Sequence, residues 1–239
     1  MRVTSASEPH AWGLYLAARG RVPIPCIAGP RGWRYARRVM PHPAPTDPAA
    51  PLRWTTEQYL RLVDEGVLGP DDKVELLEGV IVAMAPSNAR HASGIVRLSH
   101  ALFGAVGDRA VVRIQLGFMA GVYSLPEPDA AVIPGAIEDY DREHPRAALL
   151  VAEVSDSSLK QDRLTKGAIY AAAGIPEYWI VNLRDDCVEV RRQPERDKRR
   201  YASIAIARRG ERIEPVALPG ISVAVSDLLP SDLLPSPEV

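Results

Sequence analysis

The sequence predicts a mixed α/β domain whose β-sheet lies between helices. The stretch "LLVAEV" (149–154) is almost continuously apolar, which is typical of a strand buried on both faces of a sheet. Helical patterns at 55–66, 88–107 and 159–173 lie among mainly short predicted strands, without regular strand–helix alternation. A mixed sheet with helices on its faces, of the α/β or α+β type, accommodates this order.

The chain has 239 residues, which suits one main domain with tails. Residues 1–51 hold nine of the 22 prolines, and seven arginines against two acidic residues. We expect a disordered Pro/Arg-rich tail and linker at 1–51, one domain at 52–230 and a C-terminal tail at 231–239. Met40 lies just before the linker, so a translation start at Met40 is a hypothesis that the intact mass would test.

Composition excludes several classes of protein. A net charge of −1 means that nucleic-acid binding would need a local basic surface. Cys26 and Cys187 belong to no CxxC or Cys/His cluster, which argues against structural zinc and favours a reduced, cytoplasmic protein. No apolar run reaches the ~18 residues of a membrane helix. The phosphate loop, GxGxxG and HExxH motifs are absent from the sequence.

The N-terminal half of the domain predicts two helices and several strands. Thr55 or Thr56 caps a helix that ends at Gly66. Residues 73–85 predict a strand or a hairpin interrupted near Gly79, and residues 88–107 a helix. One or two short strands are expected in 110–123 and another in 126–134.

The C-terminal half continues with the buried strand at 147–154. Ser158 and Gln161 predict a capping box for the helix at 159–173, which Gly174 ends. A further strand is expected at 177–183, and short strands with turns from 187 to 225.

Glu153 is an anomaly in this pattern, because it lies in a strand predicted to be buried. An unpaired buried carboxylate costs several kcal/mol, so Glu153 should be protonated, paired or bound to a metal. Each candidate residue also has a purely structural explanation. Asp129 after a proline can be a turn former, Glu153 can pair with a basic residue, and Glu75 can be a surface carboxylate. Lys166 can form an i,i+4 salt bridge with Asp162.

Taken together, these residues indicate a chemistry. Asp129 opens one strand, Glu153 lies near the end of the next, and Lys166 follows on a helix. Two adjacent carboxylates repel each other, and a divalent cation removes that cost. Oxygen ligands suit Mg²⁺ or Mn²⁺, and a nearby lysine can orient or deprotonate a water or stabilise charge on a phosphate. The combination favours phosphodiester hydrolysis.

Over residues 54–229 the sequence resembles the Uma2 family of restriction-endonuclease-like proteins, within the PD-(D/E)XK nuclease superfamily. The matching stretches include "VELLEGVIVAMAP", "RHASGIVRLSHAL", "PEPDAAVI" and "LLVAEVSDSSLKQDRLTKGAIYAAAGIPEYWIVNL". The last is the most specific, since its order EVSxSS, DR, K, Y, AG, PEYW is hard to reach by chance.

The resemblance implies a PD-(D/E)XK core and roles for individual residues. It implies metal ligation by Asp129, Glu153 and the Val154 backbone carbonyl, and a catalytic lysine at 166. It places Glu75 near the site, and His91 matches a family histidine without a defined role. The usual (D/E)XK lysine would stand at 155, where this chain has serine, so Lys166 must reach back from the helix. Val80 also departs from the acidic residue that often follows the family's equivalent glycine.

We therefore expect a metal-dependent endonuclease using Mg²⁺ or Mn²⁺, acting on DNA rather than RNA on family grounds only. A homodimer is left open, and no membrane partner is expected. Residues 184–214 hold ten Lys/Arg against seven Asp/Glu, so these strands are either a nucleic-acid contact or a solvated hairpin. The alternative function is a non-catalytic nuclease-fold module that binds nucleic acid or protein.

Overall fold

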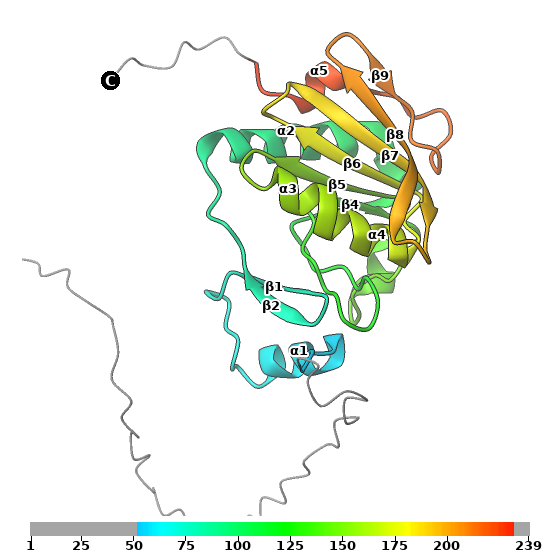
Figure 1. The fold of residues 1–239 in the computed structure, drawn as a ribbon. Helices are drawn as coiled ribbons and strands as arrows, with labels where there is room; N and C mark the ends of the chain where they lie inside the picture. The colour runs from blue at the N-terminus through cyan, green and yellow to red at the C-terminus, as the bar shows by residue number, and fades with distance from the viewer. Residues whose placement is uncertain (1–51, 232–239) are drawn as a thin grey trace, which may run out of the picture. The chain divides into compact units, whose positions relative to one another are not determined.

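The computed structural model describes residues 52–231 (Figure 1). The predicted tail at 1–51, and all of the predicted tail at 231–239 except its first residue, lie outside the described residues. The elements are α1 (Thr56–Asp64), β1 (Val74–Leu77), β2 (Val80–Ala83), α2 (Ala89–Val106), η1 (Gly107–Arg109), β3 (Val111–Ile114), β4 (Ala130–Ile133), η2 (Ile137–Tyr140), β5 (Leu150–Ser155), α3 (Leu159–Gln161), η3 (Asp162–Lys166), α4 (Gly167–Ala173), β6 (Glu177–Asn182), β7 (Cys187–Glu195), β8 (Arg200–Arg208), β9 (Arg212–Ile213), β10 (Val223–Ala224) and α5 (Val225–Leu228).

The centre of the fold is a six-stranded sheet with the order β3-β4-β5-β6-β7-β8. In this sheet β5 and β6 run parallel, while the other neighbours are antiparallel. The predicted mixed sheet is thus confirmed. The prediction of short strands after 187 is wrong for β7 and β8, which have nine residues each. Buried ion-paired residues such as Glu189 and Arg191 interrupt the apolar pattern of β7 without ending the strand.

Helices cover the two faces of this sheet (Figure 1). On one face, α2 packs Ile95, Leu98 and Leu102 into a core that includes Trp179. On the other face, the helical segment α3-η3-α4 contributes Tyr170 to a second core. Within residues 52–231 no helix is both long and apolar enough to cross a bilayer.

The N-terminal elements add a small layer beside the sheet. Thr55 caps α1 through a capping box with Gln58, as one of the two predicted capping positions. The β1–β2 hairpin turns at Gly79, whose φ of 81° belongs to the left-handed region that glycine tolerates. Backbone hydrogen bonds join Leu76 to Leu125 of the loop before β4, and this pairing holds β1 against that loop.

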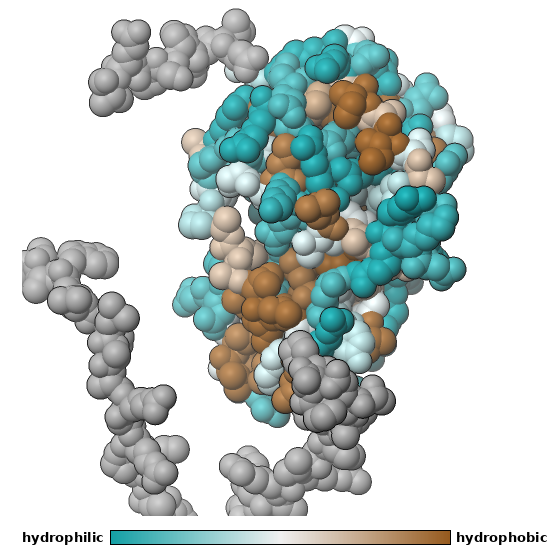
Figure 2. Space-filling view, in the orientation of Figure 1, coloured by the Kyte–Doolittle hydropathy of each residue, from teal (hydrophilic) through white to brown (hydrophobic). Residues whose placement is uncertain are grey.

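The surface at this end is apolar. Figure 2 shows hydrophobic residues gathered at the lower end of the domain, in the region of α1 and the hairpin in Figure 1. The large exposed apolar side chains near this hairpin include Leu52, Trp54, Val122 and Tyr123. The Trp54 N–H donates to the Gly79 carbonyl, and the Gly79 N–H donates to the Tyr123 carbonyl. These bonds bring the segment before α1, the turn of the hairpin and the loop before β4 together.

The helical segment 159–173 departs from its prediction at the start. Ser158 has helical dihedral angles and makes no cap hydrogen bond, so the predicted capping box with Gln161 is wrong. The Ser158 hydroxyl instead donates to Asp162, 2.6 Å away. The segment contains a π turn, η3, and ends at Gly174 in the left-handed conformation, as predicted.

Candidate active site

Two acidic residues meet where β4 and β5 lie side by side. The antiparallel register pairs Ala130 with Ala152, which brings Asp129 level with Glu153. The Asp129 N–H lies 3.4 Å from Glu153 Oε2, and the Val154 N–H donates to Asp129 Oδ2 at 2.8 Å. Both carboxylates are buried, at 7% and 3% exposure. The structure therefore brings together the two residues that the sequence singles out as ligands.

Lys166 reaches this pair from η3. Its Nζ lies 2.9 Å from Glu153 Oε1 and 3.5 Å from Glu75 Oε2. The Tyr170 hydroxyl donates to the same Glu153 oxygen at 2.7 Å. The alternative of a surface carboxylate is wrong for Glu75, which is 3% exposed. Nor is Asp162 the ion-pair partner of Lys166, whose ion pairs are with Glu153 and Glu75.

The charged groups of this cluster shift one another's pKa values. Burial raises the pKa of Glu153 to about 8, and Asp129, Asp162 and Glu75 add to the rise, although the Lys166 ammonium opposes it. Burial alone would lower the pKa of Lys166, but the surrounding carboxylates Glu153, Glu75 and Asp162 outweigh that effect and raise it. Lys166 therefore stays charged at neutral pH, and the pKa of Glu153 lies above its usual range.

The π turn that carries Lys166 is fastened to the sheet. A π turn changes which carbonyls are paired along a helix. Here the Tyr178 hydroxyl donates to the Asp162 carbonyl at 3.2 Å, and Arg191 Nη1 donates to the Arg163 carbonyl at 2.9 Å. Arg191 is itself fixed by Glu189, 2.8 Å away. Side chains of β6 and β7 thus hold the turn from which Lys166 projects.

Asp162 and Tyr170 belong to the cluster although the sequence did not predict a site role for either. Asp162 is buried and accepts hydrogen bonds from the hydroxyls of Ser155 and Ser158. Burial raises its pKa, although Lys166 and both hydroxyls act in the opposite direction. Ser155 occupies the position of the usual superfamily lysine, and its hydroxyl anchors this carboxylate. The sequence feature that could have indicated a site role for these two residues is the order of the motif, because Asp162 (in "DR") and Tyr170 ("Y") flank Lys166 in it.

His91, from the first turn of α2, lies on the other side of Asp129. Its Nε2 is 3.5 Å from Asp129 Oδ2, and its Nδ1 is 2.8 Å from the Ser87 hydroxyl. The ring is half-buried. The cluster therefore receives side chains from α2, β5, η3, α4, the hairpin and the start of β4.

The oxygen atoms of this cluster supply some of the ligands that a divalent cation requires. Within residues 52–231, no three His, Cys, Asp or Glu side chains already stand close enough to hold a metal ion. Glu153 Oε1 accepts hydrogen bonds from Lys166 and Tyr170. Glu153 Oε2 nevertheless faces Asp129, and the main-chain oxygen of Val154 lies on the same strand. Such oxygen donors fit Mg²⁺ or Mn²⁺, and a cation would offset the burial cost seen in the raised pKa of Glu153.

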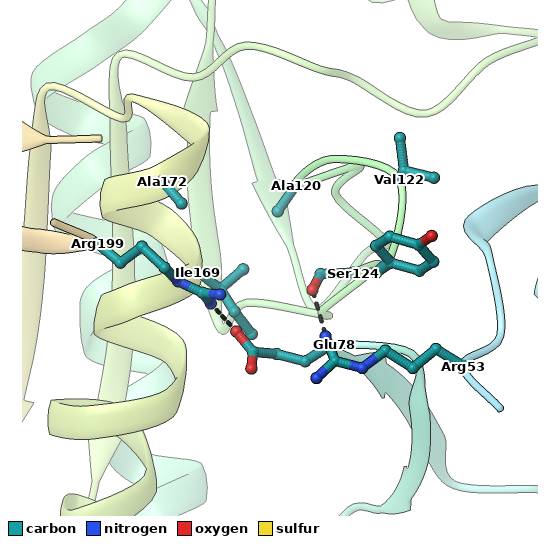
Figure 3. A pocket seen from close by; sticks show the side chains of 9 residues that line it. Arg53, Glu78, Ala120, Val122, Ser124, Ile169, Ala172 and Arg199 are labelled. Carbon is teal, nitrogen blue, oxygen red and sulfur yellow. Dashed lines mark hydrogen bonds and ion pairs between the residues drawn. The ribbon is translucent and has the colours of Figure 1, made fainter. Parts of the chain in front are cut away.

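A separate hollow of about 150 Å³ lies between α4, the turn of the hairpin and the loop before β4 (Figure 3). Arg53, Glu78 and Arg199 point into it, and Arg199 forms an ion pair with Glu78. The hollow is lined by other residues than the predicted catalytic and metal-binding ones. Arg199 belongs to the stretch 184–214, predicted as either a nucleic-acid contact or a solvated hairpin, and it already has an intramolecular partner.

The mixed six-stranded sheet with helices on both faces defines an α/β protein, and Asp129 and Glu153 meet where β4 and β5 are adjacent. The chain belongs to the Uma2 family, because the model of that family, described as "Putative restriction endonuclease", matches residues 56–226. The predicted family and fold class are thereby confirmed.

A solved structure shares this fold. It is described as the crystal structure of a putative nuclease belonging to DUF820 from Anabaena variabilis ATCC 29413. The likeness has a TM-score of 0.59 at 16% sequence identity, and covers 74% of this chain and 97% of the other. At that identity the likeness concerns the fold alone. Comparison with curated proteins gives no match.

Proposed function

We propose that the protein is a Mg²⁺- or Mn²⁺-dependent endonuclease that hydrolyses phosphodiester bonds, with DNA as its substrate. The observation that carries the proposal is the burial of Asp129 and Glu153 against each other, with Lys166 on the second carboxylate. Asp129, Glu153 and the Val154 carbonyl would hold the cation. When bound, the cation supplies a Lewis acid that polarises the phosphate and assists the attacking water.

The chain's own residues stabilise charge and position the groups during hydrolysis. Water oxygen attacks phosphorus and gives up a proton to solvent, the P–O ester bond breaks, and the leaving oxygen takes up a proton from solvent. Glu153, Glu75 and Asp162 raise the pKa of Lys166, so it stays a cation that is suited to stabilise negative charge on the phosphate. Tyr170 and Lys166 both hold Glu153 Oε1, which leaves Oε2 directed towards Asp129. Glu75 provides Lys166 with its second ion pair and helps to fix the ammonium group.

Plasmid cleavage tests the proposal. Wild-type protein should relax or linearise supercoiled DNA with Mn²⁺ or Mg²⁺, and EDTA should stop it. Glu153→Gln should abolish cleavage, because it removes a ligand charge while keeping the shape of the side chain. Glu138→Gln, an exposed carboxylate on η2, serves as the matched control and should cleave like wild type.

Cleavage of an RNA of the same sequence, measured in parallel, tests whether DNA is the preferred substrate. Nucleic-acid binding without metal-dependent cleavage would instead support the second candidate, a non-catalytic module. The observation favouring that candidate is that Lys166 already neutralises part of the acidic cluster without a metal.

A further inference from the structure

The strand β8 forms one edge of the six-stranded sheet and carries an apolar surface. Within residues 52–231 it pairs with β7 alone. Ile204 is 57% exposed and Ile206 is 48% exposed. Figure 2 shows hydrophobic residues on the part of the surface where β8 lies in Figure 1. Native proteins usually guard an exposed edge strand with proline or with charged residues, and the run "ASIAIA" (202–207) contains neither.

The main chain of β8 also directs hydrogen-bonding groups outwards. The N–H and the carbonyl of Arg208 both pair with Glu211, so they point away from β7. Main-chain direction alternates along a strand, so Ile206, Ile204 and Ala202 point the same way as Arg208. Within the described part of the chain these three residues make no hydrogen bond outside the β7–β8 pairing. The edge therefore offers a row of donors and acceptors to another extended strand.

The sequence of β8 fits a second copy of itself. Antiparallel pairing centred on Ile204 places Ile206 opposite Ala202 of the second copy, while the two Ile204 side chains meet at the axis. The other edge strand of the sheet, β3, has four residues against the nine of β8. Pairing β8 with β3 would join two different edges and build an open chain of molecules, whereas β8 with β8 closes into a two-fold dimer.

The charges at the ends of β8 suit this pairing. It brings Arg208 next to Arg200 of the second copy, and Arg200 is bound to Glu195 at 2.6 Å. Arg208 makes no ion pair within residues 52–231. The Glu195 carboxylate thus offsets the repulsion between the two arginines, and it gives Arg208 an acidic group across the interface.

We infer that the protein is a homodimer in which β8 of one copy pairs antiparallel with β8 of the other, about a two-fold axis at Ile204. The two sheets then join into one continuous sheet. The pairing satisfies the outward main-chain groups of both strands and covers their exposed isoleucines. This inference is independent of the proposed function, because β6 and β7 separate β8 from β5, which carries Glu153.

Sedimentation velocity of the full-length protein tests the dimer. Wild type should sediment with twice the 26.1 kDa mass of one chain. Ile204→Lys and Ile204→Glu should each sediment as a monomer, because two like charges would face each other at the axis. Ile137→Lys, at an exposed position of η2, is the matched control and should remain a dimer. Circular dichroism of each variant verifies that it is folded.

Mixing the two variants tests the position of the axis. An equimolar mixture of Ile204→Lys and Ile204→Glu should recover the dimer, since a lysine then faces a glutamate across the axis. Amide hydrogen exchange supplies a further readout. The outward N–H of Ile206 should exchange roughly tenfold faster in Ile204→Lys than in wild type, because it loses its partner strand.

The outcomes decide the inference without reference to catalysis. A monomeric wild type overturns it and would leave the β8 edge to a different kind of partner. A dimer that persists in both Ile204 variants places the interface elsewhere and overturns it as well. Monomeric variants whose mixture stays monomeric overturn the two-fold pairing at Ile204. Each of these results leaves the proposed function standing, since plasmid cleavage is measured separately.

Discussion

Replacing Glu153 with glutamine should change how stability depends on pH. In the unfolded chain the Glu153 carboxyl has its ordinary pKa, near 4.5, whereas burial raises it to about 8 in the fold. Between these values the folded state binds one proton more than the unfolded state. Stability must then fall as pH rises from about 4.5 to 8. Glutamine has no such proton, so the variant loses this contribution.

The size of this pH effect on the free energy of unfolding follows from a difference of one bound proton. A difference of one bound proton changes the free energy of unfolding by at most about 1.4 kcal/mol per pH unit. Between about pH 5.5 and 7.5, the free energy of unfolding should fall by about 2 kcal/mol more for wild type than for the variant. The groups facing Glu153 are Lys166, Tyr170, Asp129, Asp162 and Glu75. They are present in both proteins, so the difference between the two slopes reports mainly on residue 153.

Urea unfolding followed by tryptophan fluorescence, with EDTA present, measures these slopes. Trp179 is fully buried and should report the transition. Glu138→Gln, on the exposed surface, should retain the wild-type slope. Parallel slopes for wild type and Glu153→Gln would refute the claim that Glu153 holds its proton in the fold. Its carboxylate would then be a permanently ionised partner of Lys166.

Three other substitutions or deletions test separate parts of the molecule. Lys166→Ala should still bind Mn²⁺ by calorimetry but cleave roughly 10²–10³ times more slowly, because a group that stabilises charge on the phosphate is lost. Loss of Mn²⁺ binding would instead make Lys166 structural. If Arg199 and Arg200 contact duplex DNA, changing both to alanine should lower the salt slope of binding by roughly 0.9 per lost phosphate contact; an unchanged slope rejects that contact. Removing residues 1–51 should leave the thermal midpoint of unfolding within error, and a large fall would show that this segment packs on the domain or on a partner.

The regular elements could largely be predicted from local patterns. The helix at 88–107 has the apolar spacing of a packed helix, and the hairpin at 73–85 has a glycine at its turn. The meeting of Asp129 with Glu153 required only that two strands of the sheet be neighbours. These features depend on periodicity and turn chemistry, which a single sequence carries.

The geometry around Lys166 could not be predicted in this way. The sequence pattern predicts a uniform helix, whose capping box requires Ser158 to leave the helical conformation. The Ser158 hydroxyl binds Asp162 instead, and the π turn is held by Tyr178 and Arg191 from distant strands. No local pattern contains those contacts.

The balance of charges gives a physical reason why a divalent cation suits this site. Four carboxyl groups, from Glu75, Asp129, Glu153 and Asp162, are buried beside one ammonium group, that of Lys166. Full ionisation would leave three uncompensated negative charges. Burial first, and the neighbouring carboxylates second, raise the pKa of Glu153 in the fold. A monovalent ion would still leave two negative charges, whereas a divalent ion leaves one. We therefore expect Mn²⁺ binding to release the proton of Glu153, so that the calorimetric heat at about pH 7 varies with the ionisation enthalpy of the buffer. The Glu153→Gln variant, which has no such proton, should lose most of that dependence, and an equal dependence in both proteins would place the released proton elsewhere.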